Sequence, residues 1–343
     1  MNFYILAFLL LFTVSSSSLL LDSKPDPKTE KAGTAKIVFK STDGGQTWQD
    51  ISNGLPENLQ KDTIRGNGFF ANDQGLFLKV GNGLYHSKPN ATAPFWTIEI
   101  SRDEHSSIAP GKSGIFYWGI NLKKTDGTSV WSPIFENFQE RLRSVFETAE
   151  GTIFIAIDRG IFRSTDSGKT WKHVFAGGLV GNLAESDGVL LATSMRRIIR
   201  STDNGENWAV VTSDSSVAFD VKPIKGGFVA VTANSELGTR SLRASYDAGK
   251  TWQPIDAGDK VFIDSIGRNW NNRINDRLRA HAYMTSIIQV GENFFCTHPE
   301  GIYKSLDKGK TWKLLLPSVE NKGFNLFVSG NVIYAAIPRK GGC

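Results

Sequence analysis

The sequence of 343 residues predicts an all-β protein, and its composition and one recurring motif carry that prediction. Phe and Gly occur 22 and 34 times and Trp nine times, whereas Met occurs only three times. Aromatic residues favour strands and glycine favours tight turns, so this balance indicates many short strands rather than long helices. Hydrophobic residues make up 40% of the chain, which is enough apolar material for a packed core.

A motif of the form Ser-x-Asp-x-Gly-x-x-Trp recurs along the chain. The complete copies are 41–48, 164–171, 201–208, 245–252 and 305–312. Segment 124–131 keeps the Asp and the Trp, and segment 87–96 keeps only its end residues with two extra positions between them. Successive Trp residues at the ends of these seven segments are 48, 35, 40, 37, 44 and 60 residues apart. This spacing is typical of the blades of a β-propeller with one long insertion.

Each motif has the chemistry of a tight turn between two short apolar strands, such as 160–163 and 172–174. The Asp side chain can accept hydrogen bonds from turn amides, the Gly can adopt a positive φ, and the Trp can cover the base of the hairpin. We therefore expect a structural role for the Asp residues at this position. They are Asp43, Asp126, Asp166, Asp203, Asp247 and Asp307.

These segments resemble the Asp-box, or BNR, repeat, and the resemblance covers roughly residues 36–338. Asp-boxes occur in sialidases, xyloglucanases, sortilin-type receptors and photosystem II assembly factors. The resemblance implies a β-propeller fold in which the boxes lie on the rim, away from the functional face.

The strands around the boxes predict seven blades of four strands each. Two further strands precede most of the boxes, but the first box has only the strand 36–40 before it. The missing pair appears at the other end of the chain, at 325–329 and 331–338. We therefore expect strands from both termini to share the closing blade, because closure removes an exposed sheet edge. Six blades are the alternative, if the region 85–131 forms one irregular blade.

The N-terminal region has a different composition from the repeats. An apolar run followed by four serines and three leucines predicts a secretory signal over residues 1–21, with an uncleaved membrane anchor as the alternative. Residues 22–35 have the composition of a linker, and residues 339–343 form a tail after the propeller at 36–338. We expect a secreted or periplasmic monomer, which contacts a membrane only if the first segment stays uncleaved.

The loops opposite the boxes are the expected place for function, because they share one face of a propeller. Arg recurs in these loops and its planar fork binds carboxylates and phosphates, so an anionic glycan or a partner protein is the expected ligand. The alternative is ordinary surface charge paired with neighbouring acids. An insertion at 257–283 adds a short amphipathic helix that we expect to contact the ligand or partner. The expected binding residues are Arg65, Arg102, Arg141, Arg143, Asp158, Arg159, Arg268, Trp270, Arg273, Arg277 and Arg279.

Catalysis is the less favoured hypothesis. The sialidase signature Arg-Ile-Pro ahead of the first box is absent, and Arg65 lies instead in Ile-Arg-Gly. The sequence has no zinc motif, phosphate loop or nucleophile elbow, and its two cysteines exclude a disulfide-rich scaffold. We therefore expect a binding or scaffold protein with no cofactor, no metal and no nucleic-acid partner. The alternative is a sialidase-like or other glycoside hydrolase with two carboxylates at the channel mouth.

Overall fold

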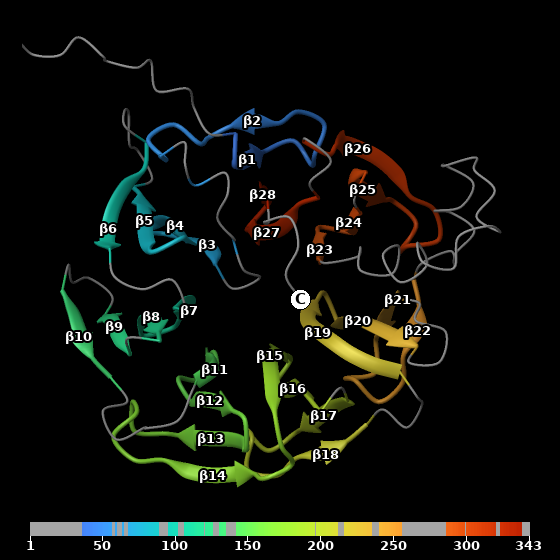
Figure 1. Cartoon of the computed structure of the whole chain (residues 1–343). Helices are drawn as coiled ribbons and strands as arrows, with labels where there is room; N and C mark the ends of the chain where they lie inside the picture. The colour runs from blue at the N-terminus through green and yellow to red at the C-terminus, as the bar shows by residue number, and fades with distance from the viewer. Residues whose placement is uncertain are drawn as a thin grey trace, which may run out of the picture. The chain divides into compact units, whose positions relative to one another are not determined.

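The structure is a computed structural model in which the described residues form seven four-stranded antiparallel sheets arranged in a ring (Figure 1). The prediction of an all-β chain with seven blades is therefore confirmed, and the six-bladed alternative is wrong. None of the described residues forms a helix long and apolar enough to cross a membrane. The described residues are 36–56, 59, 64, 68–88, 95–101, 106–119, 121–125, 130–134, 142–195, 197–211, 216–234, 240–255, 286–298, 300–319 and 323–337.

We number the blades in chain order, and the first strand of each blade lies at the central channel (Figure 1). Blade 1 contains β3 (Phe69–Asn72), β4 (Gly75–Val80), β5 (Gly83–Ser87) and β6 (Thr97–Ser101). Blade 2 contains β7 (Ser107–Gly111), β8 (Gly114–Trp118), β9 (Leu122–Thr125) and β10 (Trp131–Pro133). Blade 3 contains β11 (Leu142–Glu147), β12 (Ile153–Ile157), β13 (Gly160–Ser164) and β14 (Lys172–Phe175).

The next three blades follow the same order from the channel outward. Blade 4 contains β15 (Val180–Ser186), β16 (Val189–Ser194), β17 (Arg197–Ser201) and β18 (Ala209–Val210). Blade 5 contains β19 (Ser216–Ile224), β20 (Gly227–Asn234), β21 (Arg240–Ser245) and β22 (Gln253–Pro254). Blade 6 contains β23 (Ile287–Val290), β24 (Asn293–His298), β25 (Gly301–Ser305) and β26 (Lys313–Pro317).

Blade 7 combines both ends of the propeller, as the sequence predicts. Its strands are β27 (Asn325–Ser329), β28 (Val332–Ala336), β1 (Val38–Ser41) and β2 (Gln49–Asp50). β1 pairs with β28 in antiparallel register, with Phe39 opposite Ala335. This pairing closes the ring by hydrogen bonds between segments almost 300 residues apart, as the register of Phe39 with Ala335 shows.

The hydrophobic core lies between neighbouring blades rather than at one centre. The second strand of each blade is packed on both faces, and every residue of β12 is buried. One cluster, for example, brings Phe154 and Ala156 of blade 3 against Leu190 and Ala192 of blade 4. Strands buried on both faces carry continuous apolar runs, which is why the middle strands lack polar alternation.

A basic residue directly before a box links its blade to the next one. The Arg163 side chain donates from Nε to the Asn204 carbonyl at 2.7 Å, and Arg200 donates to the Ala248 carbonyl at 2.7 Å. Lys304 makes the equivalent contact with the Gly44 carbonyl at 3.0 Å. Each acceptor is the fourth residue of the following box, so the same contact recurs at three seams between blades.

A second contact links blades nearer the channel. The turn between the first two strands of one blade donates a backbone N–H to a side chain on the first strand of the next. Ser113 donates to Glu147 at 2.8 Å, and Ala149 donates to Glu185 at 2.9 Å. Lys225 donates to Gln289 at 2.8 Å, where the basic residue before the box is replaced by Ala244.

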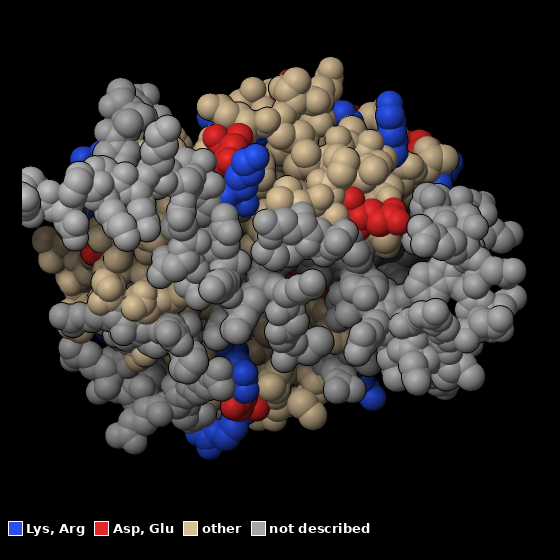
Figure 2. All heavy atoms as spheres, turned by 45° about the horizontal axis from the view of Figure 1, so that its top comes forward, with Lys and Arg blue, Asp and Glu red and all other residues tan. Residues whose placement is uncertain are grey.

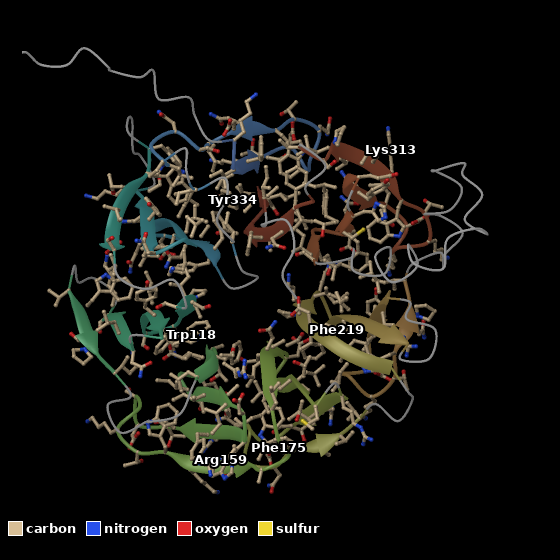
Figure 3. All side chains as sticks on the ribbon, in the orientation of Figure 1. Trp118, Arg159, Phe175, Phe219, Lys313 and Tyr334 are labelled. Atoms are coloured by element: carbon tan, nitrogen blue, oxygen red, sulfur yellow. The ribbon has the colours of Figure 1, made fainter. Side chains whose placement is uncertain are left out.

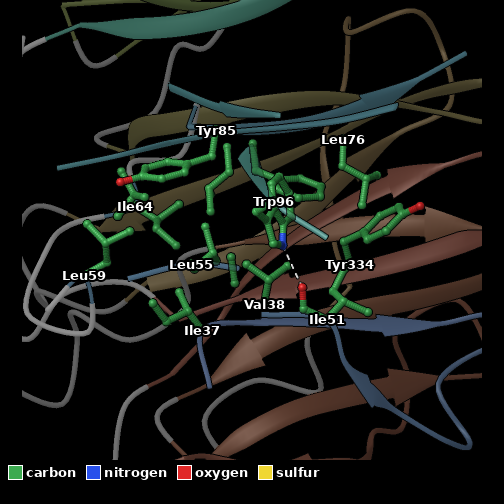
Figure 4. Close-up of a cluster of buried hydrophobic side chains, with 14 residues drawn as sticks. Ile37, Val38, Ile51, Leu55, Leu59, Ile64, Leu76, Tyr85, Trp96 and Tyr334 are labelled. Atoms are coloured by element: carbon green, nitrogen blue, oxygen red, sulfur yellow. Dashed lines mark hydrogen bonds between the residues drawn. The ribbon is translucent and has the colours of Figure 1, made fainter. Parts of the chain in front are cut away.

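The two degenerate repeats make different seam contacts. Trp96 does not close its own hairpin; its Nε1 donates to the Ile51 carbonyl of blade 7 at 2.6 Å (Figure 4). The ring is 1% exposed in a cluster that joins blades 7 and 1. Between blades 1 and 2, Glu99 accepts hydrogen bonds from Lys124 and from Trp131 Nε1. The loss of the box sequence is thus accompanied by direct side-chain contacts across these seams.

We expect Trp96→Ala to lower the free energy of unfolding by about 3–5 kcal/mol, as for other buried aromatic residues truncated to alanine. The change removes a buried ring and leaves the Ile51 carbonyl without its donor. Urea denaturation measures this loss. The control is Ile98→Ala on β6, the strand that begins directly after Trp96; the Ile98 side chain is 53% exposed, so its loss should cost less than about 0.5 kcal/mol. Equal effects of the two substitutions would contradict the role of Trp96 in the seam.

Candidate functional site

The carboxylates of the five complete boxes are used by their own turns. Asp203 accepts hydrogen bonds from the Ser201 hydroxyl at 2.7 Å and from both the backbone and the side chain of Asn207, at 3.0 and 2.7 Å. Asp247 and Asp307 make the same contacts, with Thr in place of Asn. The carboxylates of the described boxes are thus hydrogen-bonded within their own turns, and their structural role stays a prediction; Asp126 lies outside the described residues.

The box turns also press against the preceding blade. A Cβ atom on Gly205 would lie 2.3 Å from the Phe154 ring, and Gly205 adopts a φ of +76°. The neighbouring Trp208 donates from Nε1 to the Gly205 carbonyl at 3.1 Å and packs edge-on against the same Phe154 ring. Glycine is therefore required both by the turn and by the close approach of two blades. This box turn is thus a contact between blades 3 and 4.

The hydrogen bonds of the boxes lower the pKa of their carboxyl groups. The side-chain and backbone donors of residue 251 hold the pKa of Asp247 at about 2, against a usual value of 3.8. Asp203 and Asp307 also have a pKa of about 2, and the pKa values of Asp43 and Asp166 are lowered by equivalent bonds. Hydrogen bonds to the charged form favour it, so these carboxylates stay ionised well below neutral pH.

A cavity of about 280 Å³ lies in the central channel and is the candidate functional site. The first strands of six blades contribute to its wall, and blade 6 contributes Ser286, which directly precedes its first strand. Blades 7, 1, 2 and 3 supply an apolar arc, and blades 4, 5 and 6 supply a polar arc. The apolar arc includes Phe69, Ile108, Trp118, Val145, Phe146 and Phe327. Figure 3 shows Trp118 and Phe219 on opposite sides of the centre of the ring.

Three consecutive blades have a β-bulge on their channel strand. The register shifts between Leu142 and Ser144 in β11, between Val180 and Leu183 in β15, and between Ala218 and Asp220 in β19. A bulge inserts an extra residue and redirects its side chain, and bulges are frequent beside functional sites. The residues that the shifts place in the bulges include Arg143, Asn182 and Phe219.

The polar arc is a connected network. Asn182 Nδ2 donates to Asp220 Oδ1 at 2.8 Å, and the Lys222 ammonium lies 3.7 Å from Asp220 Oδ2. Lys222 Nζ also donates to Ser286 Oγ at 3.1 Å, and the Ser286 hydroxyl donates to the Leu326 carbonyl at 3.2 Å. The network therefore crosses blades 4 to 7 and holds one negative and one positive charge side by side in the channel wall.

Large apolar side chains are exposed on the side of the ring that lies opposite the box turns. Leu179 precedes β15, Met195 follows β16, and their exposed fractions are 41% and 61%. The two are joined, because the Met195 amide donates to the Leu179 carbonyl at 2.9 Å. Phe219, on the bulge of the adjoining blade, is 47% exposed. These three residues form what we call the apolar rim.

Three of the predicted binding residues are described. Arg143 and Asp158 form an ion pair, with Nε and Oδ1 2.5 Å apart, so in this pair the charges are matched with neighbours. Arg159 is exposed, and Figure 3 places it near Phe175 over the outer strands of blade 3, away from the channel. On the face drawn in Figure 2, basic and acidic side chains are scattered and in places touch one another. Outside the described residues lie Arg65, Arg102, Arg141, Arg268, Trp270, Arg273, Arg277 and Arg279, together with the insertion 257–283.

The sequence does not single out the polar network, because its arginines direct attention to the loops and the network lies on the channel strands. The signal is the pair Asp220 and Lys222, which lies within the otherwise apolar strand 217–224 and places two charged residues two positions apart. Alternate residues of a strand share a face, so both side chains reach the channel together. Among the residues that the structure describes, no three His, Cys, Asp or Glu side chains gather closely enough to hold a metal ion.

Comparison with known proteins supports the repeat and the fold. The model of the BNR/Asp-box repeat matches residues 39–50, and no curated protein sequence matches the chain. A solved structure of YCF48 bound to D1 peptide is similar at a TM-score of 0.51 and 15% identity, over 81% of this chain and 94% of that one.

Two larger proteins contain a similar propeller. The extracellular domain of BT4673 from B. thetaiotaomicron has a TM-score of 0.53 at 8% identity, over 82% of this chain and 39% of that one. The GH74 xyloglucanase from Xanthomonas campestris has a TM-score of 0.52 at 14% identity, over 83% of this chain and 52% of that one. At these identities the likeness shows the fold alone.

The lowered pKa values predict a loss of stability in acid. A carboxyl whose folded pKa lies below its unfolded value stabilises the protein above the unfolded pKa, and this stabilisation is lost as the pH falls. With folded values of about 2 for Asp203, Asp247 and Asp307, we expect the urea midpoint to fall between about pH 4 and pH 2.

The matched test replaces these three residues with Asn. The triple variant should be less stable at neutral pH and should show a flatter midpoint between about pH 4 and pH 2. The control is Asp187→Asn in the turn between β15 and β16, which should keep the wild-type profile. A wild-type midpoint that stays constant over this pH range would contradict the role of the box carboxylates.

Proposed function

We propose that this chain, a β-propeller with BNR/Asp-box repeats, is a binding protein that captures a partner protein at the mouth of its central channel. The mouth is the side opposite the boxes, where the apolar rim and the bulged strands of blades 3 to 5 lie.

The observation that carries the proposal is the combination of the apolar rim with a cavity that has one apolar and one polar arc. Exposed apolar side chains that lie together on one face are typical of protein interaction sites. Phe219 and Met195 supply large apolar contact area, while the network around Asp220 supplies fixed hydrogen-bonding groups. Apolar anchors beside a few placed polar groups are the usual composition of a recognition site.

The acidic residues of the cavity support binding rather than hydrolysis. A glycoside hydrolase of the usual kind needs two carboxyl groups on either side of the scissile bond. Among the described residues that line the cavity, Asp220 supplies the one carboxylate, and Asn182 and Lys222 already contact it. The similarity in fold to YCF48 bound to D1 peptide is compatible with a role in binding a protein segment.

We extend the proposal to the arginine loops and to location. β22 ends and β23 begins on the side of the apolar rim, and we propose that the insertion 257–283 between them contacts the partner. We keep the secretory signal at 1–21 and a secreted or periplasmic location as part of the proposal. A propeller of similar fold in the extracellular domain of BT4673 is compatible with that location.

The test compares capture of partners by two variants of the full chain. The double substitution Met195→Gln with Phe219→Ser should reduce the recovery of any specific partner from the native compartment by about tenfold or more, because two apolar anchors are lost. The control is Val210→Ser on the outer strand β18, whose exposed fraction of 51% is comparable. Neither variant should change the free energy of unfolding by more than about 0.5 kcal/mol.

The opposing results are equally definite. A partner that is captured equally well by the double variant would contradict binding at the apolar rim. Cleavage of chromogenic glycosides by the wild-type chain, abolished by Asp220→Asn, would show a glycoside hydrolase in place of a binding protein.

A further inference from the structure

We infer that the channel cavity holds a single residue of the partner's chain in extended conformation. The backbone N–H of this partner residue donates to Asp220, and its backbone C=O accepts from Lys222. An apolar side chain of the same partner segment packs on the apolar arc. The inference rests on the proposed function and names the chemical class of the segment, which is an uncharged apolar peptide rather than an acidic peptide or an anionic glycan.

Asp220 and Lys222 each have hydrogen-bonding capacity left for a ligand. Asp220 Oδ1 is used by Asn182, and Lys222 donates to Ser286. Among the described residues, Asp220 Oδ2 has no closer partner than the Lys222 ammonium at 3.7 Å, which is beyond hydrogen-bond distance. The site therefore presents one acceptor and one donor side by side, and both are held in place by their other contacts.

A ligand that matches Asp220 and Lys222 needs one donor and one acceptor side by side. In an antiparallel sheet, the N–H and the C=O of one residue point to the same side and bond to one residue of the facing strand. Asp220 and Lys222 alternate on β19 and so share a face, like the acceptor and the donor of a facing strand. An extended peptide residue fits this pair with both of its backbone groups.

The charges of the cavity wall favour an uncharged ligand. The charges of Asp220 and Lys222 oppose one another within the cavity wall, so a carboxylate or sulfate near Lys222 would also face Asp220. An uncharged peptide group avoids that repulsion and avoids the cost of burying an unpaired charge. The described part of the channel thus favours an uncharged peptide, whereas the arginine loops predict an anionic ligand.

The size and the lining of the cavity fit one apolar side chain of a longer ligand. The cavity of about 280 Å³ is slightly smaller than the usual ligand pocket of roughly 300–1,000 Å³, so it holds part of a ligand rather than a whole one. Phe69 and Phe327 form a tilted pair in its wall, with ring centroids 4.9 Å apart. An aromatic or branched apolar side chain gains most from burial against such rings.

The experiment uses the full chain and a positional-scanning library of hexapeptides that are acetylated and amidated at their ends. We expect selection of a large apolar residue at one position and no requirement for Asp or Glu. Lys222→Met should weaken binding of the selected peptide by about ten- to hundredfold, the usual effect of losing a charged hydrogen bond. The control is Lys225→Met, an exposed lysine on the box side of the same strand's end, which should bind as wild type.

A change in the peptide separates a direct contact from a loss of folding. N-methylation of the anchor residue removes its N–H donor and should weaken binding to the wild-type protein. The same methylation should have little further effect on Asp220→Asn, because the contact between the two groups is then already weakened. Additive losses would overturn the assignment of Asp220 as the acceptor.

The other outcomes distinguish this inference from the proposed function. A library that binds nowhere, or that selects Asp or Glu, would overturn the inference, as would binding that is unchanged in Lys222→Met. Partner capture that depends on Met195 and Phe219 in those same circumstances would leave the proposed function standing. Loss of both dependences would remove the two together.

Discussion

Hydrogen bonds between neighbouring blades are the constraint on which the rest of this propeller depends. A four-stranded blade cannot bury both of its faces alone, so each blade needs its neighbours on either side. The Arg163 and Arg200 side chains bond to the carbonyl of the next box, and Glu147 and Glu185 bond to the preceding turn. From blade 2 to blade 7 these contacts run in one direction, with the donor on one blade and the acceptor on the next. At the seams on either side of blade 1, the donors lie instead on the following blade.

The ring of blades explains why the candidate functional site lies at the channel. On the box side of the ring, the carboxylates already accept hydrogen bonds from their own turns and the box glycines press against the preceding blade, so that side has little capacity for new contacts. The channel strands are held by their seams but interrupted by bulges in blades 3, 4 and 5. The bulges bring Asn182 and Phe219 to the channel and its mouth, on strands that are paired within their blades.

Much of the fold could be predicted from the sequence because the boxes are local. The turn chemistry of each box is contained within eight residues, and the spacing of the boxes reports the number of blades. The pairing of β1 with β28 was also predictable, since one blade lacked two strands at one end of the chain. The role of Trp96 was not, because its acceptor, Ile51, is 45 residues away and belongs to another blade.

The site was harder to predict than the fold. Bulges leave no reliable mark in a single sequence, and the Asp220–Lys222 pair became meaningful only once Asn182 and Ser286 were seen beside it. Arginine content pointed to loops, yet Arg143 is paired with Asp158 and Arg159 lies away from the channel. Sequence position alone does not say which charges neutralise one another.

Site-specific photo-crosslinking tests the central claim most directly, which is that the partner binds on the side opposite the boxes. The photoreactive amino acid p-benzoylphenylalanine would replace Phe219 in one variant and Tyr246, in a box turn, in the other. The two native rings are 47% and 48% exposed, so the probes are matched in accessibility and differ in the side they occupy. We predict crosslinks to a partner from position 219 and none from position 246; the reverse pattern would contradict the claim.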